Sequence, residues 1–121
     1  MQNLIVITDQ ENQFINAYIS AIYFTNCGDS DQPSYDSELH SDCRRDCIID
    51  CLAFLRQSLP YLDCCMDFDQ AGHDFWLTRN GHGTGFWDRP EIYGKYSSEL
   101  LTKKSESFGC YDPYFIIEAK S

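Results

Sequence analysis

Two stretches in the first half of the chain repeat apolar residues at helical intervals. The first follows a capping box, in which the Thr8 hydroxyl accepts from the Glu11 amide and the Glu11 carboxylate reaches back to Thr8. Apolar residues then recur at spacings of three and four, which predicts a helix from Asp9 to Phe24. The same kind of spacing predicts a second helix from Glu38 to Gln57, ending before Pro60.

The second half of the chain combines aromatic runs with glycine-rich turns. Two such runs, Phe75–Thr78 and Phe86–Arg89, flank Asn80-Gly81 and further glycines, which predicts a β-hairpin over residues 74–89. The apolar residues between Tyr96 and Phe108 predict a third helix that Gly109 would end.

Apolar segments at the two ends of the chain read as strands, one over Asn3–Ile7 and one over Tyr114–Ala119. With no internal repeat or linker, this order predicts a single α+β domain over residues 1–121. It would contain about three helices and a mainly antiparallel sheet. The longest apolar runs are too short to cross a membrane and no basic leader precedes them, so we expect a cytoplasmic protein.

Negative charge is confined to the first part of the chain. The formal net charge is −10, and residues 1–75 hold thirteen acids and three arginines, whereas residues 76–121 hold six acids and six bases. Direct binding of nucleic acid needs clustered lysine and arginine, so we expect none. The asymmetry points to a basic partner instead.

The predicted second helix carries a ladder of carboxylates, each four residues after the last. Like charges at this spacing repel, so stability alone would not favour the ladder. It places one carboxylate about every 6 Å along the helix axis, a step similar to that of backbone phosphates. The alternative is a solvated acidic face that keeps a small protein soluble. The candidate partner-binding residues are these four and the acidic residues around them: Glu38, Asp42, Asp46, Asp50, Asp29, Asp31, Asp36, Asp67 and Asp69.

The seven cysteines do not predict a disulfide framework, because their number is odd and no secretion signal precedes them. Cys43, Cys47 and Cys51 lie near one helical face, where Cys64, Cys65, His73 or His82 could complete a tetrahedral metal site. The spacing matches no usual zinc module, and cysteine on the inner face of a helix commonly packs in the core. We therefore expect no metal and no cofactor.

The most distinctive segment is AGHDFWLTRNGHGTGFWDR, residues 71–89. It resembles a core shared by a group of small phage- and prophage-encoded proteins. Asp50-Cys51 and the tail from Leu101-Thr102 onward resemble other parts of that group, while Pro90-Glu91-Ile92 replaces its glycine-rich link. The resemblance implies a phage or mobile-element origin and implies no reaction.

The same segment contains residues suited to acid–base chemistry: His73, Asp74, Arg79 and His82. An imidazole oriented by a carboxylate can act as a general base, and an arginine can bind an anionic substrate. The structural alternative is that these side chains hold the hairpin and its turn. Neighbouring residues on a strand point to opposite faces, so His73 and Asp74 are not expected to form one dyad.

We therefore expect a phage accessory protein that inhibits a host defence effector, such as a CRISPR–Cas complex, by partial mimicry of nucleic acid. Its partner would be a host protein with a basic surface, and its location the host cytoplasm. Two alternatives stay open. One is a small enzyme that uses the four residues just named, and the other is a structural or regulatory phage protein, docking through the hairpin or forming a homodimer.

Overall fold

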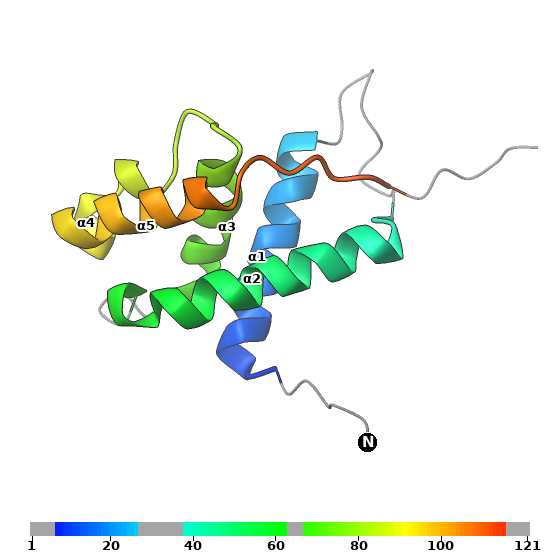
Figure 1. The fold of residues 1–121 in the computed structure, drawn as a ribbon, viewed down its shortest axis with the longest axis horizontal. Helices are drawn as coiled ribbons and strands as arrows, with labels where there is room; N and C mark the ends of the chain where they lie inside the picture. Colours follow the sequence, from blue (N-terminus) through cyan, green and yellow to red (C-terminus); the bar gives the residue numbers. More distant parts are fainter. Residues whose placement is uncertain (1–6, 27–37, 63–66, 116–121) are drawn as a thin grey trace, which may run out of the picture.

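The computed structural model describes residues 7–26, 38–62 and 67–115. Every regular element in these ranges is helical (Figure 1). The elements are α1 (Asp9–Asn26), α2 (Ser41–Leu62), α3 (Phe68–Arg79), the 3₁₀ helix η1 (Phe86–Asp88), α4 (Pro90–Tyr93) and α5 (Lys95–Ser107). The expected α+β fold with an antiparallel sheet is therefore wrong. Within the described ranges, β structure amounts to one isolated bridge between Leu39 and Phe115.

The expected hairpin over residues 74–89 is also wrong, because its first half belongs to α3. The Asp67 side chain accepts a hydrogen bond from the Gln70 amide and so caps this helix. Phe68, Ala71 and Phe75 then follow at helical spacing and are buried. The chain leaves the helix through Gly81, which has a positive φ of 71°. A docking surface made by a hairpin is thereby excluded as well.

Helix α1 begins as the sequence predicts. The Thr8 amide donates to Glu11 Oε1 at 3.0 Å, and the Glu11 amide donates to Thr8 Oγ1 at 3.1 Å, which confirms the capping box. Arg56 of α2 also donates to Glu11 Oε2 at 2.7 Å. This hydrogen bond is the main reason that the pKa of Glu11 lies below its usual value.

Helix α2 begins three residues later than expected, which leaves Glu38 before the helix, and it continues past its expected end at Gln57. Pro60 has no amide hydrogen, so the last turn lacks one helical hydrogen bond. The turn nevertheless places Leu62 in the core, where its side chain is fully buried. Helix α5 agrees with the prediction to within one residue at each end. The strand expected over residues 3–7 and the strand expected over residues 114–119 fall mostly outside the described residues.

Helices α1 and α3 lie side by side, and α2 crosses α1 at a steep angle (Figure 1). Aromatic rings fill the space between the helices. The rings of Phe54 and Phe75 are stacked with centroids 4.1 Å apart, and Phe14, Phe86 and Phe108 surround them. Among the described residues, no helix is long and apolar enough to cross a membrane.

Gly72 allows α1 and α3 to approach closely. A Cβ at this position would overlap the carbonyl oxygen of Phe14 and lie 2.9 Å from the Cβ of Ala17. We expect Gly72→Ala to lower the free energy of unfolding by about 2 kcal/mol, because overlap with backbone outweighs a gain in helix propensity of roughly 1 kcal/mol. Urea denaturation followed by circular dichroism measures this. Gly83→Ala is the control, because its Cβ would meet nothing within 4 Å; an equal effect of the two changes would contradict the close approach.

Candidate functional site

The four carboxylates of the acidic ladder have different surroundings. Glu38 and Asp42 are exposed, whereas Asp46 and Asp50 are half-buried. Asp46 Oδ2 accepts a hydrogen bond from the Tyr111 hydroxyl at 3.0 Å, and Asp50 Oδ2 accepts one from Arg79 Nη1 at 2.9 Å. The inner half of the ladder therefore binds other parts of the same chain.

Tyr111, the partner of Asp46, belongs to a segment that follows α5, residues 109–115. This segment runs along α2 toward its first residues, where the His40 amide donates to the Tyr114 carbonyl at 3.0 Å. The Tyr111 amide is held by Asn80 Oδ1 at 2.8 Å. The other candidates, Asp29, Asp31 and Asp36, lie outside the described residues.

Arg79 connects α3, α2, α1 and the end of α5. Its side chain is only 3% exposed. Besides Asp50, its guanidinium donates to the Tyr18 hydroxyl at 3.0 Å and to the Phe108 and Gly109 carbonyls at 3.1 and 2.8 Å. The ring of Phe75 lies 5.4 Å from its guanidinium carbon. Every part of this arginine is thus used inside the fold.

Asp74 is the most enclosed carboxylate of the described residues, with no exposed side-chain surface. Arg89 Nε donates to both of its oxygens at 2.9 and 3.0 Å, and the Tyr93 hydroxyl donates to Oδ2 at 2.7 Å. Gln70 Nε2 donates to Oδ1 at 3.1 Å. Hydrogen bonding to Asp74 raises the pKa of the Arg89 guanidinium. This carboxylate joins α3 to the start of α4.

The four candidate catalytic residues do not converge on one point. Asp74 and Arg79 are turned into the core and are saturated with partners, while His82 is exposed in the turn after α3. Of these four residues, His73 alone lines the pocket that is described below. A general base and its orienting carboxylate need to be within hydrogen-bond reach of each other, and these residues do not provide that pair.

Most of the distinctive segment 71–89 serves the fold. The Trp76 indole donates to Thr25 Oγ1 at 2.8 Å, and the Phe86 amide donates to Thr78 Oγ1 at 3.0 Å. A Cβ at Gly85 would overlap that same Thr78 oxygen. Trp87, in contrast, is half exposed. Most side chains of residues 71–89 therefore hold α3, η1 and α4 together.

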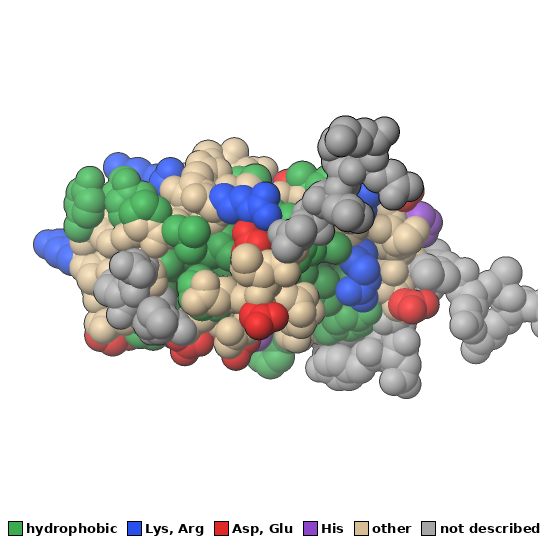
Figure 2. All heavy atoms as spheres, turned by 90° about the horizontal axis from the view of Figure 1, so that it is seen from below, with side chains coloured by type: hydrophobic (Ala, Val, Ile, Leu, Met, Phe, Trp, Pro, Cys, Tyr) green, Lys and Arg blue, Asp and Glu red, His purple; other side chains and the backbone are tan. Residues whose placement is uncertain are grey.

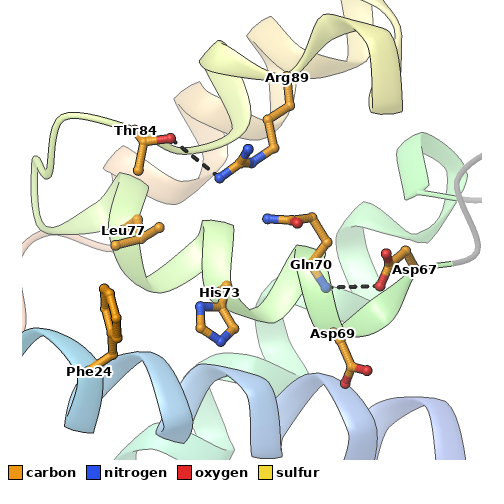
Figure 3. A pocket seen from close by; sticks show the side chains of 8 residues that line it. All are labelled: Phe24, Asp67, Asp69, Gln70, His73, Leu77, Thr84 and Arg89. Carbon is orange, nitrogen blue, oxygen red and sulfur yellow. Dashed lines mark hydrogen bonds between the residues drawn. The ribbon is translucent and has the colours of Figure 1, made fainter.

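A pocket of about 560 Å³ lies between the end of α1, one face of α3 and the loop before α4 (Figure 3). Three of its lining residues are candidates predicted from the sequence: Asp67, Asp69 and His73. The remaining lining residues were missed, although Asp69, His73 and Leu77 recur every four residues and would have marked one helix face. The complete lining is Phe24, Asp67, Asp69, Gln70, His73, Leu77, Thr84 and Arg89.

Three of the cysteines, Cys43, Cys47 and Cys51, are buried on the inner face of α2 with free thiols. Burial raises the pKa of Cys47 to about 12 and raises that of Cys51 as well. Thiols of this kind are poor nucleophiles and poor metal ligands, because both roles need the thiolate. In the described ranges, no three His, Cys, Asp or Glu side chains form a group that could hold a metal ion.

The exposed part of the site therefore consists of Glu38 before α2, of Asp42 in its first turn, and of Asp67 and Asp69 beside the pocket. Comparison of the chain with protein-family models, with curated proteins and with solved structures gave no match.

Proposed function

We propose that this chain is a phage or mobile-element accessory protein that inhibits a host defence protein by occupying its basic, nucleic-acid-binding surface. The phage origin rests on the resemblance of residues 71–89. The mode of action rests on charge. A CRISPR–Cas effector is the class of host target that we would test first.

One observation carries the proposal: exposed carboxylates outnumber exposed basic side chains among the described residues. Four of the five arginines form ion pairs within the chain, and those of Arg79 and Arg89 are directed at half-buried or buried carboxylates. Of the described residues, ten acidic ones are exposed against five basic ones. A surface with this surplus attracts a basic groove over a distance of about 10 Å at moderate salt.

The arrangement of the carboxylates supports a charge field more than a literal copy of a phosphate backbone. Figure 2 shows acidic side chains dispersed over the face, with basic side chains between them. Asp46 contributes to this field although it accepts a hydrogen bond from Tyr111, whereas the charge of Asp50 is compensated by Arg79. Asp42 is paired with Arg45, so the exposed contacts to a partner come from Glu38, Asp67 and Asp69.

The test is inhibition of nucleic-acid binding by purified CRISPR–Cas effector complexes, measured by fluorescence anisotropy at low and at high salt. We expect inhibition at low salt that weakens as salt rises. Replacing Glu38, Asp67 and Asp69 by Gln, Asn and Asn should weaken inhibition about tenfold, since each exposed charge contributes up to about 1 kcal/mol.

The matched control removes the same number of exposed charges from residues 76–121, in which acids and bases balance. In this variant Glu91, Glu99 and Glu106 are each replaced by Gln. This variant should inhibit within about threefold of the original protein, because longer-range charges are screened. Inhibition of no effector, or inhibition that salt does not change, would rule out the proposed mode of action.

A further inference from the structure

The pocket beside α3 combines an acidic edge with an apolar wall. Figure 3 shows His73 projecting between α1 and α3, with Phe24 at one end of the space and the acidic pair at the other. Phe24 is 74% exposed, although it is a large aromatic residue. Such a side chain next to a hollow is available to a ligand without any rearrangement of the core.

The charge of the pocket is negative. Its one arginine, Arg89, is neutralised by Asp74, and its Nη2 also lies 3.4 Å from Thr84 Oγ1. Asp67 and Asp69 are exposed, and among the described residues no cation forms an ion pair with either. A cation entering the pocket therefore meets uncompensated carboxylates, while an anion meets an arginine that is already occupied.

The lining also offers neutral hydrogen-bond acceptors. The Gln70 side chain donates from Nε2 to Asp74. Its Oε1 is the atom of the same amide that can accept a hydrogen bond from a ligand. In Figure 3 the Gln70 side chain extends toward the side of the pocket where Arg89 lies. A planar cation with several donors can use such acceptors together with a carboxylate, and its apolar stem can pack on an aromatic ring.

We propose that this pocket binds the guanidinium of an arginine side chain presented by a partner protein. Asp69 binds the charge, Phe24 and Leu77 at the opposite end of the pocket pack against the aliphatic stem, and Gln70 accepts a further hydrogen bond. The assignment deepens the proposed function and rests on it for the source of the arginine. A basic nucleic-acid-binding surface is where such side chains are abundant.

The probe is the peptide acetyl-Gly-Arg-Gly-amide, titrated into the ¹⁵N-labelled protein and followed by NMR. We expect saturable shifts confined to amides of α3 near His73 and to the end of α1. The citrulline peptide, which has the same shape without the charge, should produce none. Asp69→Asn should weaken binding by about two- to fivefold, the range expected for one exposed charge, and Phe24→Leu by about twofold, because the smaller side chain covers less of the aliphatic stem.

Glu99→Gln is the matched control, because it removes an exposed charge from α5. This variant should bind the arginine peptide as the original protein does. Equal shifts with the citrulline peptide, or unchanged binding by Asp69→Asn, would overturn the pocket assignment.

The two proposals fail separately. Saturable binding of the peptide without inhibition of any effector would keep the pocket and reject the proposed function. Salt-sensitive inhibition that Phe24→Leu leaves unchanged, in a protein that does not bind the peptide, would keep the function and reject the pocket.

Discussion

Replacing Arg79 by Met is expected to lower the free energy of unfolding by about 3 kcal/mol, as for breaking a buried ion pair. The methionine fills much of the same space but donates no hydrogen bond. Asp50 loses its cation, and the Tyr18 hydroxyl and the Phe108 and Gly109 carbonyls lose a donor. Urea denaturation followed by circular dichroism measures the loss.

A local readout separates this explanation from a general loss of packing. The Tyr111 amide, held by Asn80, should exchange its hydrogen faster in Arg79→Met, because the segment after α5 is no longer tied to α3 at Phe108 and Gly109. Arg45→Met is the control, since its exposed pair with Asp42 contributes less than about 1 kcal/mol. An Arg79 variant as stable as the Arg45 variant would contradict the role given to Arg79.

Replacing Asp74 by Asn should cost a similar amount, about 3 to 4 kcal/mol. The amide preserves the shape of the side chain but removes the charge that faces Arg89. It also places an NH₂ group at one of the two oxygen positions, so that either Gln70, which donates to Oδ1, or Tyr93, which donates to Oδ2, loses its acceptor. Thermal and urea denaturation of the purified variant measure the effect.

Two further variants calibrate this network. Tyr93→Phe removes one neutral donor and should cost about 1 kcal/mol. Asp88→Asn changes an exposed carboxylate that accepts only from Thr84 among the described residues, and should cost less than about 0.5 kcal/mol. A different order of the three effects would show that the buried carboxylate is not the centre of the network.

The sequence was sufficient to predict α1, α2 and α5, because each has a regular apolar face and an identifiable beginning or end. The capping box at Thr8 and Glu11 is a local signal, and it places the start of α1 correctly. Local hydrogen bonds of this kind depend on residues three apart, so sequence alone contains them. The end of α2 was missed because burial of Leu62 outweighs the proline rule.

Helix α3 was missed because two signals in one segment compete. The aromatic run from Phe75 and the Asn80-Gly81 pair are typical of a hairpin, but Phe68, Ala71 and Phe75 also have helical spacing. Burial of that face against α1 decides the outcome, and Gly72 makes the contact close. This is a tertiary effect, and it changed the predicted fold class.

The ion pairs could not be predicted from sequence either. Asp50 and Arg79 are separated by 29 residues, and Asp74 and Arg89 by 15. Their encounter depends on the packing of the helices. The spacing of the acidic ladder therefore predicts one exposed surface, whereas two of its four carboxylates, Asp46 and Asp50, bind other parts of the chain.

Unfolding of this protein can be followed chemically, because it exposes the buried thiols of α2 to a reagent. Cys110 is exposed on the segment after α5, whereas Cys43, Cys47 and Cys51 are enclosed in the core. A thiol-reactive dye reaches Cys110 in the native protein, but it reaches the three enclosed sulfurs only when α2 separates from its neighbours. The rate at which the dye labels those three cysteines therefore measures how often the helix bundle opens, and no cysteine needs to be introduced for it.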